Sequence, residues 1–153
     1  MTVTFATESY EQVIEEIKPL NAQHWDEIAL NKDFIGLDPD YEFYEAMDRL
    51  GRMVVATARD DDGPLIGYAI YFLGPHKHYR EHLWAISDIY WIHPEHRRGR
   101  VGMNLFKFVE QALRTRKVSV MHTTSKTAHP AAARMLESLG HTMIEVGHSK
   151  RLG

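Results

Sequence analysis

The chain has 153 residues, of which 44% are hydrophobic and 25% are charged, and its formal net charge is −3. This length suits one globular domain with a packed core, expected to span residues 1–153. The slightly acidic balance disfavours a general nucleic-acid or membrane-surface binder, and the lack of cysteine excludes disulfides, thiolate metal sites and a cysteine nucleophile.

The N-terminal part is expected to form a strand followed by helices. Val3 and Phe5 alternate with threonine, which indicates a short strand and not a signal peptide. Apolar residues then recur every three or four positions over residues 13–28, as is typical of an amphipathic helix. Pro19 lies inside this segment and predicts a kink or two short helices.

A further helix is expected before residue 51. Asp38 suits its N-cap, Pro39 its first position, and Gly51 the residue after its end. Four residues are expected on its inner face: Phe43, Tyr44, Met47 and Leu50.

The hydrophobic period then changes to two, which is typical of strands. Strands are expected over residues 52–59, 65–73 and 83–92. The first two form an antiparallel hairpin around the turn at residues 60–64, and residues 74–82 form a polar loop. The third strand is nearly all apolar and therefore central, with only Ser87 and Asp88 breaking the run.

The C-terminal half is expected to continue with alternating elements: a helix over residues 104–116, a strand over 118–123, a helix over 130–139 and a last strand near 143–146. The crossover helix makes the 118–123 strand parallel to the preceding one. The predicted order is β-α-α-α-β-β-β-α-β-α-β. The predicted fold class is α/β, a mixed sheet with helices on both faces.

The turn between the central strand and the next helix carries the strongest functional signal. It contains Arg97, Arg98 and Arg100 together with Gly99 and Gly102. The first N–H groups of a helix have no intrahelical partner, and the helix dipole adds partial positive charge there. Arginines at that position predict a phosphate or pyrophosphate site.

Two segments resemble the GCN5-related N-acetyltransferase (GNAT) superfamily. The first follows the family signature Gln/Arg-x-x-Gly-x-Gly/Ala from Arg97 to Gly102, with Arg100 at the usual first glycine and Gly99 one position early. The second, residues 129–141, follows Asn-Pro-x-Ala-x-x-x-Tyr-x-x-x-Gly-Phe, with Leu136 at the tyrosine position. The resemblance covers nearly the whole chain and implies the GNAT-like acyltransferase fold.

The resemblance implies transfer of an acetyl group from acetyl-CoA to a primary amine. The coenzyme pyrophosphate is expected on the backbone N–H groups of the arginine turn, and the pantetheine arm along the end of the central strand. A backbone N–H of Trp91 or Ile92 is the candidate that polarises the thioester carbonyl. The expected coenzyme-binding residues are Trp91, Ile92, Arg97, Arg98, Gly99, Arg100, Val101, Gly102, Met103 and His129.

Asp88 and Tyr90 are the catalytic candidates. Asp88 is the sole carboxylate in an apolar strand, near where family members place a catalytic Glu, and burial would raise its pKa towards a useful range. The alternative is a carboxylate satisfied by its neighbours. No tyrosine follows Tyr90 in the sequence, so the usual acid is missing. Tyr90, His129 and Ser125 are substitutes, and protonation by solvent is another route.

Two alternatives to acetyl transfer remain for the function. A catalytically silent acyl-CoA-binding sensor is motivated by the missing tyrosine, and a small nucleic-acid-binding domain is disfavoured by the net charge. A metal site is disfavoured because the five histidines between His76 and His96 have no helical zinc spacing.

The acceptor amine is not identified by the sequence, although Tyr41, Phe43 and Tyr44 are candidates to line its pocket. The oligomeric state stays open: the short C-terminal strand leaves an edge that a second chain could cover, and the resemblance implies that a homodimer is possible. A cytoplasmic location is expected, since no segment approaches the roughly 18 consecutive apolar residues of a membrane span.

Overall fold

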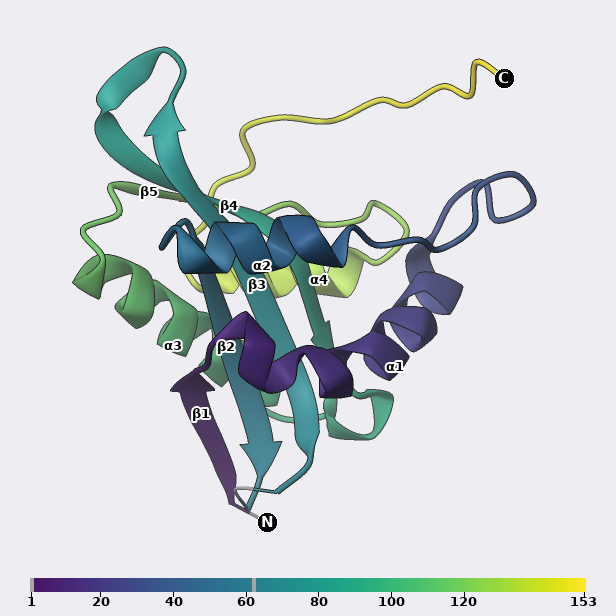
Figure 1. The fold of residues 1–153 in the computed structure, drawn as a ribbon, viewed down its shortest axis with the longest axis horizontal. Coiled ribbons are helices and arrows are strands. Elements are labelled where there is room, and N and C mark those ends of the chain that lie inside the picture. Colours follow the sequence, from purple (N-terminus) through teal and green to yellow (C-terminus); the bar gives the residue numbers. More distant parts are fainter. Residues whose placement is uncertain (1, 62) are drawn as a thin grey trace.

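The computed structural model describes residues 2–61 and 63–153 and contains a five-stranded mixed sheet in the order β1-β2-β3-β4-β5 (Figure 1). The strands are β1 (Val3–Thr7), β2 (Met53–Asp60), β3 (Leu65–His76), β4 (Tyr79–Ile92) and β5 (Val120–His122). Neighbouring strands are antiparallel except β4 and β5, which are parallel as the crossover helix between them predicts. The predicted turn at residues 60–64 includes Asp62, which lies outside the described residues.

The helices are α1 (Tyr10–Ile28), α2 (Tyr41–Arg49), α3 (Val101–Thr115) and α4 (Pro130–Ser138), with a 3-10 turn η1 (Pro94–His96) after β4. Of the two outcomes predicted at Pro19, a kink or two short helices, the second is wrong, because α1 is one continuous helix that contains Pro19. Its N-terminus has a reciprocal cap between Ser9 and Gln12. The N-cap of α2 is Asp40 and not Asp38, since the Asp40 side chain accepts the Phe43 N–H.

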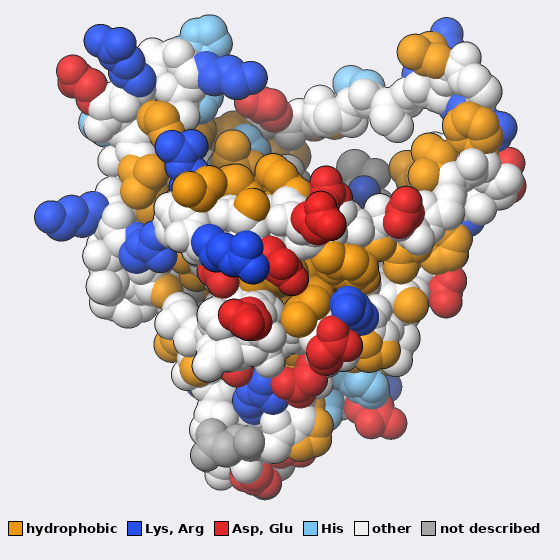
Figure 2. Space-filling model, viewed as in Figure 1, with side chains coloured by type: hydrophobic (Ala, Val, Ile, Leu, Met, Phe, Trp, Pro, Cys, Tyr) orange, Lys and Arg blue, Asp and Glu red, His pale blue; other side chains and the backbone are white. Residues whose placement is uncertain are grey.

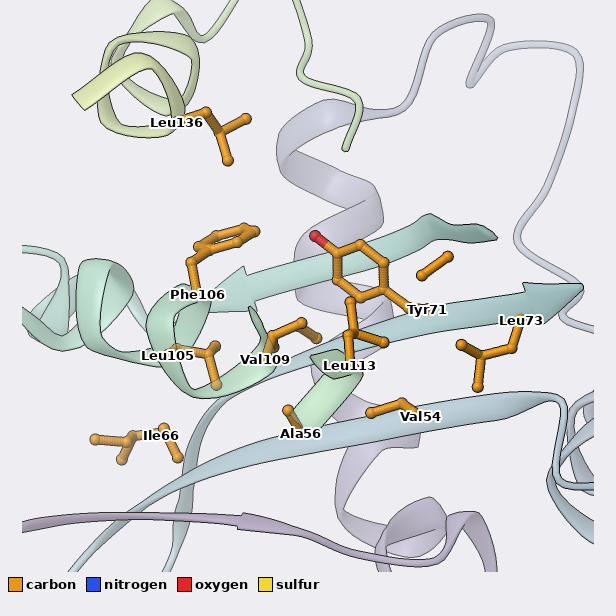
Figure 3. Packing of buried hydrophobic residues seen from close by; sticks show 13 residues of the cluster. Val54, Ala56, Ile66, Tyr71, Leu73, Leu105, Phe106, Val109, Leu113 and Leu136 are labelled. Carbon is orange, nitrogen blue, oxygen red and sulfur yellow. The ribbon is translucent and has the colours of Figure 1, made fainter. Parts of the chain in front are cut away.

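The helices cover the two faces of the sheet, as predicted (Figure 1). On one face α1 and α2 pack against Met53, Val55 and Ile70. On the other, α3 and α4 pack against alternate residues of the same strands, and Figure 3 shows Leu105, Phe106 and Leu136 converging there on the sheet. Strand alternation explains both cores, because successive side chains of β2 and β3 point to opposite faces. Two of the four residues predicted on the inner face of α2, Phe43 and Leu50, are exposed.

Two segments differ from the sequence predictions. Residues 74–82 are not a polar loop: β3 and β4 continue through them and form a hairpin that extends beyond the sheet (Figure 1). The predicted last strand at Met143–Val146 is absent from the described residues. The chain after α4 crosses a gap beside the body of the molecule (Figure 2), and near its end Arg151 pairs with Asp33 in the loop after α1. Pairing between β4 and β5 covers only three residue pairs, so a further strand would have little sheet edge to join.

None of the helices in the described part of the chain has the length and apolar character needed to cross a membrane.

Candidate active site

Asp88 is the extra residue of a β-bulge in β4. Ser87 and Ile89 stand opposite the consecutive residues Tyr71 and Ile70 of β3, so Asp88 has no partner of its own in the ladder. A bulge re-phases the alternation of side chains along its strand. Ser87 therefore faces the α3 side and Asp88 and Ile89 face the α1–α2 side, while Tyr90 returns to the α3 side.

The Asp88 carboxylate is bonded to helix α2. Its Oδ2 accepts a hydrogen bond of 2.6 Å from the Tyr44 hydroxyl. Asp88 keeps contact with solvent, yet burial of its carboxyl by neighbouring groups raises its pKa above the usual range, and the Tyr44 hydrogen bond opposes that shift. Asp88 is thus a carboxylate suited to accept a proton nearer neutral pH than an exposed aspartate.

A cavity of about 340 Å³ lies next to this pair. Its walls come from α1, the loop that follows α1, α2, and the β3 and β4 strands. Tyr44 and Ile89, which flank Asp88, both line it. Of the three aromatic residues predicted for an acceptor pocket, Tyr44 is part of the wall, whereas Tyr41 and Phe43 are not among its lining residues. The bulge therefore places a proton-accepting group beside a cavity that is open to solvent.

Tyr90 does not join Asp88. Its ring packs edge-on against Phe106 of α3, with centroids 5.0 Å apart, and its hydroxyl donates to the Thr124 carbonyl at 2.8 Å. The sequence suggests that residues 88 and 90 share a face, because they are two apart in a strand. The bulge separates them onto opposite sides of the sheet, so these two catalytic candidates do not face a common reaction centre.

Strands β4 and β5 separate immediately before the bulge. Their backbone pairing ends at Ile86 and His122, and beyond it side chains bridge the two chains. Ser87 Oγ accepts the Thr124 N–H at 3.0 Å, and the Tyr90 hydroxyl bonds the Thr124 carbonyl. The main-chain groups of β4 beyond residue 86 are thus free of β5, which is the splayed edge that the sequence resemblance implies.

The alternation of the β3–β4 ladder identifies which main-chain groups face this edge. His93 N–H donates to the Ile66 carbonyl at 2.8 Å, in register with the Ile92–Gly67 pair. Alternate pairs in an antiparallel ladder exchange hydrogen bonds, so the main chain of Trp91 points towards β3 and that of Ile92 points away. Of the two predicted donors, the Ile92 N–H is therefore the one that faces the gap.

The arginine turn after β4 presents a row of free amides. Helix α3 begins at Val101, three residues earlier than predicted. Within the described residues, none of the amide N–H groups from Arg98 to Met103 donates to a protein acceptor. The φ of Gly99 is +103°, which confirms that this glycine adopts an unusual backbone conformation. Arg98 and Arg100 are exposed beside these amides, so the turn is suited to a pyrophosphate.

Arg97 has a different role from its two neighbours. Its Nε donates to the Ile92 carbonyl at 2.8 Å, and its guanidinium pairs with Glu27 of α1 at 2.8 Å. Glu27 also accepts a 3.3 Å bond from the indole N–H of Trp91, which is buried. The Arg97 side chain thus fixes the end of β4 to α1, whereas Arg98 and Arg100 remain available to an anion.

His129 and Leu136 lie on α4. His129 is the N-cap residue of the helix and is exposed, and its side chain makes no capping bond. Leu136, at the position of the family tyrosine, is buried in the same hydrophobic cluster as Phe106 of α3 (Figure 3). On η1, His93, Glu95 and His96 lie close together, and His93 Nδ1 accepts the Glu95 N–H at 3.3 Å, so His93 caps this turn.

His24 and Lys126 line the cavity but are not among the sequence-predicted site residues. His24 belongs to the apolar stripe of α1, where a histidine is hard to distinguish from a core residue. Lys126 lies in the loop after β5, and no local pattern links that loop to α1.

Comparison with known proteins agrees with this geometry. The family model described as "Acetyltransferase (GNAT) family" matches residues 13–141. No curated protein sequence matches the chain. Among solved structures, a ribosomal-protein-alanine N-acetyltransferase from Brucella melitensis biovar Abortus 2308 has a TM-score of 0.73 at 19% identity, covering 99% of this chain and 100% of that one.

Two further structures share the fold. An aminoglycoside acetyltransferase from an uncultured soil metagenomic sample, in complex with sisomicin, has a TM-score of 0.75 at 11% identity, covering 99% and 97% of the two chains. A putative acetyl transferase from Pyrococcus furiosus has a TM-score of 0.71 at 18% identity, covering 99% and 100%. The likeness to these structures concerns the fold, and the family match gives the assignment: this chain belongs to the GNAT family of N-acetyltransferases.

Proposed function

We propose that the protein transfers an acetyl group from acetyl-CoA to a primary amine by direct attack in a ternary complex. The observation that carries this proposal is the bulge in β4. It directs Asp88 into the cavity side of the strand, while the same strand leads at its end to the free amides of the arginine turn. One strand thus connects a proton acceptor with a phosphate site.

The residues of the turn fit the coenzyme. The amides of Arg98 to Met103 and the exposed charges of Arg98 and Arg100 would hold the pyrophosphate. The splayed main chain of β4 would receive the pantetheine arm. Acetyl-CoA, when bound, supplies a thioester whose carbon accepts the amine nitrogen as the C–S bond breaks.

Asp88 would remove the proton from the incoming ammonium, directly or through water. The Ile92 N–H would donate to the thioester carbonyl oxygen, which gains negative charge during the reaction. As the amide forms, the nitrogen would lose its second proton to solvent. The departing thiolate would take a proton from solvent or a nearby group, because Leu136 has no proton to give. The Tyr90 hydroxyl already donates to Thr124 and would have to break that bond to serve as the acid.

A second candidate is a catalytically silent acyl-CoA-binding sensor. The burial of Leu136 at the position of the family tyrosine favours it, since no hydroxyl stands there. Both candidates use the same arginine turn. They differ only in whether an amine is consumed.

The test measures binding and turnover separately. Thermal unfolding with and without millimolar acetyl-CoA reports binding, because a ligand of the folded state raises the melting temperature. Turnover is followed as thiol released from acetyl-CoA with a panel of primary amines, and the chain contributes no thiol of its own because it lacks cysteine. Amine-dependent release that falls at least about a hundredfold in Asp88→Asn supports catalysis. Binding without release on any amine supports the sensor, and failure to bind acetyl-CoA contradicts both.

A further inference from the structure

The cavity beside Asp88 has walls that are mainly aromatic and aliphatic. Tyr10, Trp25 and Tyr44 contribute rings, and several aliphatic residues complete the surface: Ile17, Ile28, Leu37, Ile70 and Ile89. Tyr10 and Tyr44 are stacked, with centroids 5.3 Å apart. The volume of about 340 Å³ lies near the lower end of the range of roughly 300–1,000 Å³ for ligand pockets. A cavity of this size and lining suits the apolar part of a small ligand.

The charges of the wall do not suit a polycation. Among the described lining residues, Asp38 is the sole acid and Lys126 the sole lysine or arginine, so their charges offset each other. Asp88, bonded to Tyr44, adds one carboxylate at the reaction end. A polyamine or an aminoglycoside carries several ammonium groups and would leave most of them without a carboxylate. One ammonium group is what this site can neutralise.

Two polar side chains of α1 interrupt the apolar wall. The Tyr68 hydroxyl donates to Asn21 Oδ1 at 2.8 Å, and this bond leaves the Asn21 NH₂ as the group with free hydrogens. His24 is about nine-tenths buried, and within the described residues no group forms a hydrogen bond with its ring. Burial lowers the pKa of His24 to about 4, so the ring is neutral at pH 7. The His24 ring lines the cavity and has no protein partner among the described residues, so it is available to a ligand or to water.

From these features we infer that the acceptor is a small monoamine with a flat apolar body and one oxygen atom, which the Asn21 amide and the His24 ring bind. This inference rests on the proposed acetyl transfer and gives its substrate class. Asn21 and His24 are one helical turn apart on α1 and both line the cavity. Tyr68 is a positioning residue, since it fixes the orientation of the Asn21 amide.

The first experiment compares four amines as ligands and as acceptors: tyramine, 2-phenylethylamine, spermidine and kanamycin. Calorimetric titration in the presence of coenzyme A measures binding without turnover. Tyramine is expected to bind about tenfold more tightly than 2-phenylethylamine, which lacks the oxygen, and more tightly than either polycation. Tighter binding of spermidine or kanamycin than of tyramine would overturn the inference.

The second experiment uses variants of α1. Asn21→Ala and His24→Gln are each expected to narrow the tenfold preference for tyramine to about threefold or less, with little change for 2-phenylethylamine. Gln23→Ala, at an exposed position of the same helix, is the matched control and should retain the full preference. Tyr68→Phe should also reduce the preference for tyramine. Because Tyr68 acts through Asn21, the double variant Tyr68→Phe/Asn21→Ala should show the same preference as Asn21→Ala.

The outcomes separate this inference from the proposed function. If tyramine binds with the expected preference but no thiol is released, the substrate class stands as a ligand class and the acetyl transfer fails. If thiol is released with a polycation and not with tyramine, the transfer stands and the inference fails. A third outcome is that the variants lose affinity for 2-phenylethylamine and tyramine equally, at an unchanged melting temperature. In that case Asn21 and His24 shape the pocket but do not bind the ligand oxygen, and the inference is wrong.

Discussion

The Tyr44 hydroxyl of α2 donates a 2.6 Å hydrogen bond to the Asp88 carboxylate in the bulge of β4, joining residues 44 positions apart in the chain. The two effects of the surroundings on Asp88 have opposite signs. Burial raises the pKa of the carboxyl, and the Tyr44 hydrogen bond to its ionised form lowers it. The pKa of the proposed base is therefore lowered by Tyr44, a residue that also lines the cavity.

Replacing Tyr44 by phenylalanine should raise the pKa of Asp88 further, because only the lowering effect is removed. The proposed mechanism needs the ionised carboxylate, so kcat/KM should fall as pH falls through this pKa. In Tyr44→Phe that acidic limb is expected at higher pH than in the wild type. The measurement is the pH profile of kcat/KM for a single amine.

The control for this experiment is Tyr41→Phe, the same change on the same helix at a tyrosine that does not contact Asp88. Its acidic limb should coincide with that of the wild type. An unchanged limb in Tyr44→Phe would show that Asp88 is not the group whose ionisation controls the rate.

Asp88→Asn is expected to lower activity and raise stability at neutral pH. The folded-state pKa of Asp88 lies above its unfolded value, so the ionised group costs folding free energy once the pH exceeds these values. The neutral amide avoids that cost. The gain in melting temperature should therefore be present near pH 7 and vanish at pH values below the unfolded pKa of about 4. A gain that is the same at all pH values would contradict the assignment.

The three arginines of the turn should respond differently to mutation. Arg98→Gln and Arg100→Gln remove exposed charges and are each expected to weaken acetyl-CoA binding by about 1 kcal/mol, or about fivefold, with no change in melting temperature. Arg97→Gln breaks the contacts with Glu27 and the Ile92 carbonyl, so it should lower the melting temperature by about 2–4 °C.

Lys107→Gln is the matched control for the arginines, since it removes an exposed positive charge from α3 beyond its first turn. It should leave coenzyme affinity unchanged. Equal losses of affinity in Lys107→Gln and Arg98→Gln would mean that the overall charge of the protein, and not the turn, attracts the coenzyme.

Gly67 marks a close approach between β3 and the end of β4. A Cβ at this position would collide with Ile92 Cδ1 and lie 3.0 Å from the Trp91 carbonyl oxygen. Gly67→Ala is expected to destabilise the protein by about 1–3 kcal/mol through overpacking. In the Ile92→Val background, which lacks the Cδ1 atom, Gly67→Ala should lower the free energy of unfolding by less. Denaturant unfolding of the four proteins measures this coupling, and additive effects would contradict it.

Much of the fold is predictable from the sequence because its signals are local. The amphipathic stripe of α1 and the apolar run ending at Ile92 each define an element by periodicity or composition alone. The arginine turn follows from its place between strand and helix, and the φ of Gly99 agrees with the expected need for glycine. The N-cap of α2 is displaced because Asp38 and Asp40 are equally good caps by type.

The arrangement of the site is less predictable because it depends on register. The run from Leu83 to Ile92 is nearly all apolar, so it carries no alternation from which an extra residue can be recognised. The bulge at Asp88, and with it the contact to Tyr44, is therefore invisible in the sequence. The separation of Asp88 from Tyr90 has the same cause. Arg97 resembles its neighbours in sequence, and only its contact with Glu27 distinguishes it.

The bulge at Asp88 has a consequence for the kinds of change that β4 can accept. Substitution at this position alters one side chain and leaves the ladder in place. Deletion of Asp88 would remove the bulge and leave Ser87 and Ile89 opposite their present partners Tyr71 and Ile70, so the residues that follow would keep their faces. The proposed base is thus carried by the one residue of β4 that the ladder with β3 does not need.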